Sequence, residues 1–196
     1  MNDVDQHLKD ITEIRSMMER SSKVLSLSGL SGVGAGMIAI AGVLFAQWIH
    51  SRVAPEEVIT YLVGDALVVL VLAIGTAILF SYRMARKKDL PFWTATSRFL
   101  IVDLAIPLGA GGLFCYALMR HESYGLIPGT MLVFYGLALI NGSKYALKEI
   151  RFLGLTELVL GCVAIFVSDQ GLNIWAIGFG IMHIVYGLQM YFRYER

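Results

Sequence analysis

Four ionisable side chains lie inside apolar stretches of this sequence and are its best candidates for chemistry. They are Asp65, Asp103, Glu157 and His183. A carboxylate at the centre of a membrane helix costs roughly 2.5–3.5 kcal/mol on insertion scales, so such a group faces protein or water and avoids lipid. Histidine gains or loses a proton near neutral pH. We therefore expect these four side chains to bind or relay ions or protons.

Glu157 and His183 lie deep within two apolar stretches that follow each other in the chain. Either a bound proton or a basic partner such as Lys144 or Arg98 would neutralise Glu157. His183 has two interpretations. It is either a core histidine that bonds Glu157 or a tyrosine, or it is the second member of a proton relay with Glu157.

Asp103 lies four residues before Pro107, and a proline inside a helix releases the backbone carbonyl of the residue four positions earlier. Asp103 would then offer a carboxylate and an unpaired backbone oxygen, as broken helices do in many transporters. We expect a kink or gate here, helped by the following glycines, which are Gly109, Gly111 and Gly112. The alternative is a kink that only shapes packing, with Asp103 satisfied by a nearby hydroxyl or cation.

Recognised enzyme motifs are missing from the sequence. It has no nucleophile elbow, zinc-protease motif, P-loop or dinucleotide fingerprint, so no catalytic residue is assigned. The histidines and the two cysteines have no metal-site spacing, and we expect no metal and no cofactor. Cys115 and Cys162 fit either a disulfide or two free thiols.

The composition is that of a membrane protein. Of the 196 residues, 57% are hydrophobic and only 16% are charged, where soluble domains have about 25%. The net charge of +1 gives no field for nucleic acid, so we expect no nucleic-acid partner. We predict an all-α integral membrane protein, a bundle of six transmembrane helices over residues 24–196. The expected spans are residues 24–49, 58–82, 92–119, 124–141, 150–168 and 172–192, each of roughly the 17–25 residues that cross a bilayer.

Residues 1–23 are predicted to form an amphipathic cytoplasmic helix. Val4, Leu8, Ile11 and Ile14 recur at three- and four-residue spacing, which places them on one face. Such a helix either lies on the membrane surface or docks a soluble partner.

Basic residues collect in the N-terminal segment, in alternate loops and at the C-terminus, whereas the opposite loops contain only Arg52 and Arg120. The positive-inside rule then places both termini on the cytoplasmic side of the membrane, which we expect to be a bacterial inner (plasma) membrane. Anionic lipid is the partner expected for the basic loop residues, which are Arg83, Arg86, Lys87, Lys88, Lys144, Lys148 and Arg151.

Small residues recur along the spans at helical spacing. Ser28, Gly32 and Gly36 are four residues apart, and such rows let helices approach closely within or between subunits. Two further pairs share their neighbours and spacing, Gly129 with Gly136 and Gly180 with Gly187. The stretch from Gly154 to Gly161 likewise matches that from Gly29 to Gly36. We interpret the bundle as three repeated helical hairpins and expect a homo-oligomer.

These features favour an oligomeric pore or carrier for protons, ions or a small solute. The alternative is a membrane effector or scaffold that does not transport and docks a partner through residues 1–23. An intramembrane enzyme is a third, less supported class. The layout of paired, glycine-rich helices with short loops resembles small six-span bacterial membrane proteins of the acid-resistance HdeD type. That resemblance is architectural, and no residue role is transferred from it.

Overall fold

The computed structural model describes residues 28–89 and 91–196, and all regular structure in these residues is helical. The expected all-helical fold is therefore confirmed. The predicted amphipathic helix over residues 1–23 lies outside the described residues.

Six helical stretches follow one another. They are α2 (Gly29–Arg52), α3 (Pro55–Lys87), α4 (Ala95–Arg120), α5 (Ile127–Gly142), α6 (Lys148–Phe166), and a final stretch of α7 (Gly171–Trp175), η4 (Ala176–Met182) and α8 (His183–Tyr194). Short 3₁₀ turns precede or follow them at η1 (Tyr124–Leu126), η2 (Ser143–Tyr145) and η3 (Ser168–Gln170). All but α6 are long and apolar enough to cross a membrane.

Helix ends follow the local chemistry of the sequence. α3 begins at Pro55, with Glu56 and Glu57 in its first turn, where proline and acidic residues are favourable. Thr94 precedes α4, and its side chain accepts the backbone N–H of Ser97. Two helices end later than expected: α2 continues to Arg52, and α3 continues through the basic stretch to Lys87. Basic side chains favour the negative C-terminal end of a helix, so they extend it.

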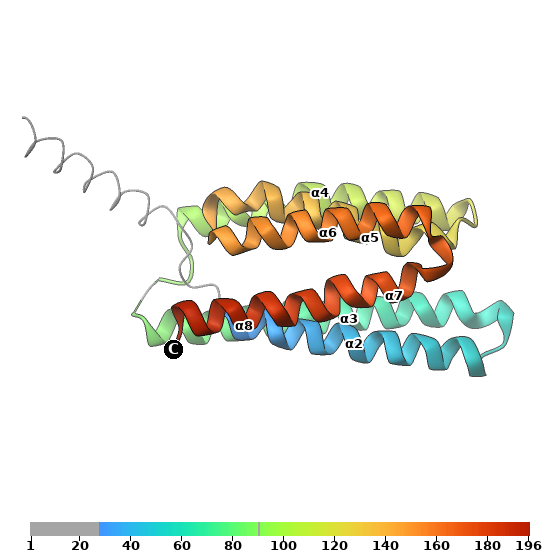
Figure 1. Ribbon diagram of the computed structural model, residues 1–196, viewed down its shortest axis with the longest axis horizontal. Helices are drawn as coiled ribbons and strands as arrows, with labels where there is room; N and C mark the ends of the chain where they lie inside the picture. Colours follow the sequence, from blue (N-terminus) through green and yellow to red (C-terminus); the bar gives the residue numbers. More distant parts are fainter. Residues whose placement is uncertain (1–27, 90) are drawn as a thin grey trace, which may run out of the picture.

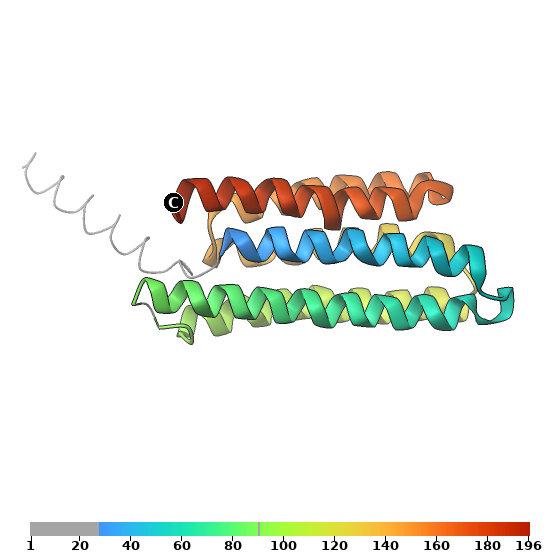
Figure 2. The same cartoon turned by 90° about the horizontal axis from the view of Figure 1, so that it is seen from below.

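The helices form two layers of three (Figures 1 and 2). The first layer contains α3, α2 and α8 in that order, and the second contains α4, α5 and α6. Within each layer, neighbouring helices are packed along much of their length, and the closest pair is α5 with α6. Between the layers, contact is concentrated where α7, η4 and α8 face α5 and α6.

Glycines bring helix backbones into direct contact inside both layers. A Cβ atom on Gly36 of α2 would lie 2.6 Å from the carbonyl oxygen of Gly180. In the second layer, a Cβ on Gly161 of α6 would lie 2.8 Å from the carbonyl oxygen of Gly129. Gly154 likewise faces Gly136. We call these two contact lines the glycine seams, α2 with η4 and α8, and α5 with α6.

The C-terminus ties together three helix ends on one side of the molecule. The Glu195 carboxylate accepts the backbone N–H of Gly29 and, at 3.2 Å, the hydroxyl of Ser28, so it caps the start of α2. Lys88, after α3, donates to the Tyr194 carbonyl at 3.2 Å. The Tyr194 hydroxyl donates to buried Glu149 of α6 at 3.0 Å.

Replacing a glycine in a seam should separate the helices. We expect Gly161→Ala to lower the free energy of unfolding by about 1–3 kcal/mol, because its Cβ would lie 2.6 Å from the backbone nitrogen of Val133. Thermal unfolding of the detergent-solubilised protein measures this. Gly75→Ala on α3 is the matched control, since nothing lies within 4 Å of its Cβ position, and it should be neutral or stabilising. Equal losses in both variants would contradict the seam.

Candidate functional site

Glu157 lies at the midpoint of α6, nine residues from Lys148 and nine from Phe166. At 1.5 Å per residue, its Cα lies about 13 Å from either end of the helix. The side chain is 0% exposed, and neither carboxylate oxygen has a hydrogen-bond partner among the described residues. A buried carboxylate without hydrogen bonds is costly, so its retention calls for a function.

His183 is the neighbour of this carboxylate. It is also near the middle of its helical stretch, and its Nδ1 lies 3.4 Å from Oε1 of Glu157. The same nitrogen lies 3.0 Å from the carbonyl oxygen of Gly178. A carbonyl oxygen only accepts, so Nδ1 carries the hydrogen whether the ring is neutral or charged.

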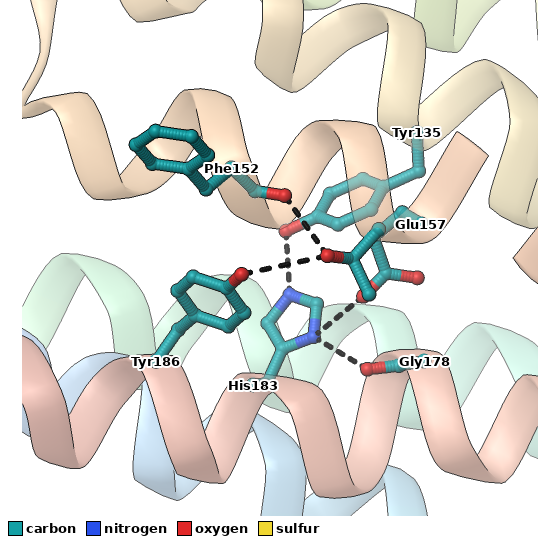
Figure 3. A network of polar contacts seen from close by, with 7 residues as sticks. Tyr135, Phe152, Glu157, Gly178, His183 and Tyr186 are labelled. Carbon is teal, nitrogen blue, oxygen red and sulfur yellow. Dashed lines mark hydrogen bonds and ion pairs between the residues drawn. The ribbon is translucent and has the colours of Figure 1, made fainter. Parts of the chain in front are cut away.

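The other ring nitrogen of His183 faces α5. Nε2 lies 2.8 Å from the hydroxyl of Tyr135 (Figure 3). When the ring is neutral, Nε2 accepts a hydrogen bond from the tyrosine hydroxyl, and when the ring is charged, Nε2–H donates one to the tyrosine oxygen. The three side chains therefore form a continuous polar chain from α5 through α8 to α6, in the order Tyr135, His183, Glu157.

The π-helix η4 makes room for this chain. A Cβ on Gly178 would collide with Oε2 of Glu157 and would lie 2.5 Å from Cδ2 of Leu132. The absence of a side chain at Gly178 therefore creates the space that the carboxylate occupies, and its carbonyl fixes the His183 ring. Single-turn π segments of this kind are frequent at functional sites.

Aromatic rings cover the site on one side. The Phe179 ring lies 4.7 Å from that of Tyr135 and 4.8 Å from that of Trp175, measured between ring centroids. The Trp175 indole nitrogen is buried without a hydrogen-bond partner among the described residues. These rings lie on the Tyr135 side of the polar chain and make its surroundings largely apolar, and electrostatic interactions are strong in such surroundings.

A second polar contact lies beside the first, because Thr156 directly precedes Glu157 in α6 and Tyr186 follows His183 by about one turn of α8. Thr156 Oγ1 donates to the Phe152 carbonyl at 3.0 Å and lies 3.4 Å from the Tyr186 hydroxyl (Figure 3). Tyr186 thus joins α8 to α6 beside the His183–Glu157 contact.

Asp103 belongs to a different cluster. Its carboxylate lies 2.8 Å from Nζ of Lys144, and its backbone oxygen accepts the Asn141 side-chain amide at 2.9 Å. α4 runs through Pro107, so the carbonyl that proline releases is bonded by a side chain of α5. The expectation of an unpaired oxygen at Asp103 was wrong, because Asn141 reaches it across the helix interface. Lys144, considered as a partner for Glu157, pairs with Asp103 instead.

The remaining predicted residues are spread over the molecule. Asp65 lies on α3 facing Gly42 of α2, away from Glu157. Gly111 packs on Phe134, whereas Gly109 and Gly112 have open space beside them. Gly32, Gly129, Gly136, Gly180 and Gly187 all lie in the glycine seams. Cys115 and Cys162 are free thiols. The basic loop residues are exposed at the end of the bundle that holds the C-terminus, and they are Arg83, Arg86, Lys87, Lys88, Lys144, Lys148 and Arg151.

Sequence reasoning associated Glu157 with His183 but missed Tyr135 and Gly178. Tyr135 precedes Gly136 in the sequence as Tyr186 precedes Gly187, and Gly178 is one glycine among many. Neither residue type signals a site on its own. In the part of the chain that the structure describes, no group of three or more His, Cys, Asp or Glu side chains could hold a metal ion.

Comparisons of the chain with protein-family models, with curated proteins and with solved structures found no match. The geometry of the site therefore carries the functional argument.

Removal of the His183 side chain should leave the Glu157 carboxylate buried without a partner. We expect His183→Leu to destabilise the fold by about 3–5 kcal/mol, the range for breaking a buried pair, and Glu157→Gln to cost less because it removes the charge. The loss of unfolding free energy in the double variant should be smaller than the sum of the two single losses by about 0.5–3 kcal/mol. Reversible unfolding in mixed micelles gives all three values, and additive losses would show that the two side chains do not interact.

Proposed function

We propose that the protein is a six-span membrane protein that moves protons through its helix bundle, with Glu157 and His183 as the relay. The observation that carries this proposal is the polar chain itself. A fully buried carboxylate without hydrogen bonds touches a histidine at the midpoint of two adjacent helices. Membrane transport proteins hold their coupling ions near the bilayer midplane.

Membrane insertion is supported by the surface of the bundle. Val71 on α3 and Ile106 on α4 are each 66% exposed, and other large apolar side chains surround them. Soluble monomers rarely expose apolar patches of that extent, and lipid is the environment that accepts them. α6, the most charged of the six stretches, packs along α5 through the seam from Gly154 to Gly161 and would cross the membrane with it.

The orientation follows from the basic end of the bundle. Exposed lysines and arginines lie at the end that holds the C-terminus, whereas Glu56, Glu57 and Asp169 lie towards the opposite end. The positive-inside rule supports a cytoplasmic C-terminus and contact of the basic loops with anionic lipid in the plasma membrane.

The contacts also support the three-hairpin repeat. Gly36 faces Gly180 and Ile184 in one seam, and Gly161 faces Gly129 and Val133 in the other, with the same spacing on both sides. The three hairpins are α2 with α3, α4 with α5, and α6 with the final stretch that ends in α8. The first helix of one hairpin packs on the second helix of another, as α2 does on α8 and α6 does on α5. The equivalent pair, α4 with α3, makes few contacts. The glycines with open space on α3 and α4 leave room for a homo-oligomer contact there.

A proton moves along the chain in two transfers. Neutral His183 takes up a proton at Nε2 from the Tyr135 hydroxyl, which gains another from water as it gives its own, and the charged ring releases the proton on Nδ1 to Oε1 of Glu157. The ring is then neutral with its hydrogen on Nε2, and it returns to the Nδ1–H form, which donates to the Gly178 carbonyl, before the next transfer. The 3.4 Å between Nδ1 and Oε1 exceeds the usual range of an N–H···O hydrogen bond, so the second transfer needs a small closure of α6 on α8. Asp103 and Asp65 are outside this path.

Glu157→Gln should abolish proton flux. A carboxamide cannot take up a proton, and we expect flux to fall at least about 100-fold, the lower end of the contribution of a positioned acid–base group. Flux is measured in liposomes with an internal pH-sensitive dye under an imposed potassium diffusion potential. Tyr135→Phe should lower flux with assembly intact.

Asp65→Asn is the matched control, because Asp65 is another acid inside an apolar helix but lies on α3 facing Gly42, outside the polar chain. It should transport like the natural protein. Unchanged flux in Glu157→Gln would refute the proposed function.

A further inference from the structure

The contacts within each layer differ in kind from the contacts between the two layers. Inside each layer, the glycine seams are backbone contacts without an ionisable side chain, as where Gly29 meets Gly187 and Gly154 meets Gly136. Contacts of that kind leave little freedom, because packed backbones cannot shift without collision. In each layer a seam fixes two of the three helices, α2 with α8 and α5 with α6, and the third helix packs along one of them, α3 on α2 and α4 on α5.

The polar contacts between the layers lie along one edge, beside the apolar packing of α7 and Phe179 on the second layer. Three joints connect α8 and η4 to the second layer: Arg193 and Tyr194 with Glu149, Tyr186 with Thr156, and His183 with Glu157 and Tyr135. The helices on the other side, α2 and α3, make only sparse contacts with α4, α5 and α6 within the described residues. Figure 1 shows the two layers lying one above the other, with α6 and α8 together at the front.

We propose that this edge is a proton-operated hinge, on which the first layer (α3, α2, α8) rocks against the second (α4, α5, α6). The inference rests on the proposed function and adds its conformational step. When the pair holds a shared proton, protonated His183 and the Glu157 carboxylate attract each other across the edge. Loss of that proton leaves a carboxylate without a counter-charge in apolar surroundings, which favours entry of water and separation of α6 from α8.

Among the residues that the structure describes, this pair is the only contact between an acid and a histidine near the centre of the edge. Towards Glu157, α5 presents Tyr135 and α8 presents His183 and Tyr186. α7 and η4 contain no ionisable residue. Towards His183, α2 presents the backbone at Gly32 and has no ionisable residue before His50 at its far end. Protonation therefore changes the attraction between layers while the seams inside them stay the same.

The contacts at the outer joints would let the first layer rock on the second as one body. The outer joints are the Thr156–Tyr186 contact at 3.4 Å, the Arg193–Glu149 contact at 3.4 Å and the Tyr194–Glu149 hydrogen bond at 3.0 Å, of which the first two are longer than close hydrogen bonds. Rigid-body rocking of one bundle on another around a central site is a known route to alternating access. The sparse side, between α3 and α4, is where such rocking changes distances most.

Spin-label distances test the hinge directly. In a full-length protein with Cys115→Ala and Cys162→Ala, labels are placed at Val71→Cys on α3 and Ile106→Cys on α4, both exposed. Double electron–electron resonance in liposomes compares the distance at about pH 5 and about pH 8, the range over which histidine changes charge. We expect the distance to shift by more than about 2 Å, the scale of a domain rearrangement.

Two pairs within layers serve as controls, Val71 with Val185 in the first layer and Ile106 with Val159 in the second, all exposed positions. Their distances should not change with pH. The shift between layers should disappear in Glu157→Gln, in which the carboxylate no longer titrates.

The possible outcomes test the hinge independently of the proposed proton transport. No pH-dependent shift between layers, or the same shift in Glu157→Gln, overturns the hinge, even where the liposomes conduct protons. Equal shifts within and between layers overturn it too, because the layers are then not rigid. A shift that Glu157→Gln abolishes supports the hinge, and if proton flux is absent in the same liposomes, the proposed transport is wrong while the hinge stands.

Discussion

Direct contact between helix backbones at paired glycines is the constraint on which the rest of this structure depends. Between apolar helices in lipid, van der Waals packing of small residues provides the association that the hydrophobic effect provides in water. Gly36 against Gly180 and Gly161 against Gly129 fix two helix pairs in register. They create two layers of defined composition, and they leave no room for polar side chains inside the seams. Inside the layers, polar groups therefore lie outside the seams, as Asp103 and Lys144 do between α4 and α5, and the buried Glu157–His183 pair lies at the edge where the layers meet.

Glu157 is the clearest departure from that rule. It follows Gly154 by three residues, as Gly32 follows Gly29 in the other seam. Where Gly32 lies against the neighbouring backbone, the Glu157 side chain leaves its seam and crosses to the other layer, into the space beside Gly178. Natural sequences break their local rules mainly at functional sites, and compensate elsewhere. Here the compensation is the π-helix, which provides both the space and the carbonyl that orients His183.

A single polar edge between two rigid layers joins the chemistry to the mechanics. The same His183–Glu157 contact that would pass a proton also holds α8 against α6 at the centre of the edge. A change in protonation thus acts where the layers are joined, and the glycine seams carry the motion through each layer. Asp103 with Lys144 lies within the second layer, where it ties α4 to the end of α5, and this explains why an acid of similar depth has a structural role.

The sequence by itself determined the helical class, the positions of the apolar stretches, the glycine pattern and the association of Glu157 with His183, because periodicity, length and charge act locally along the chain. Tertiary structure decided the partners. Only folding showed that Asn141 occupies the Asp103 carbonyl, that Tyr135 completes the polar chain and that Gly178 makes room for the carboxylate. These contacts depend on helix rotation and on a π turn. Both are set by how whole helices pack, which no local pattern of residues encodes.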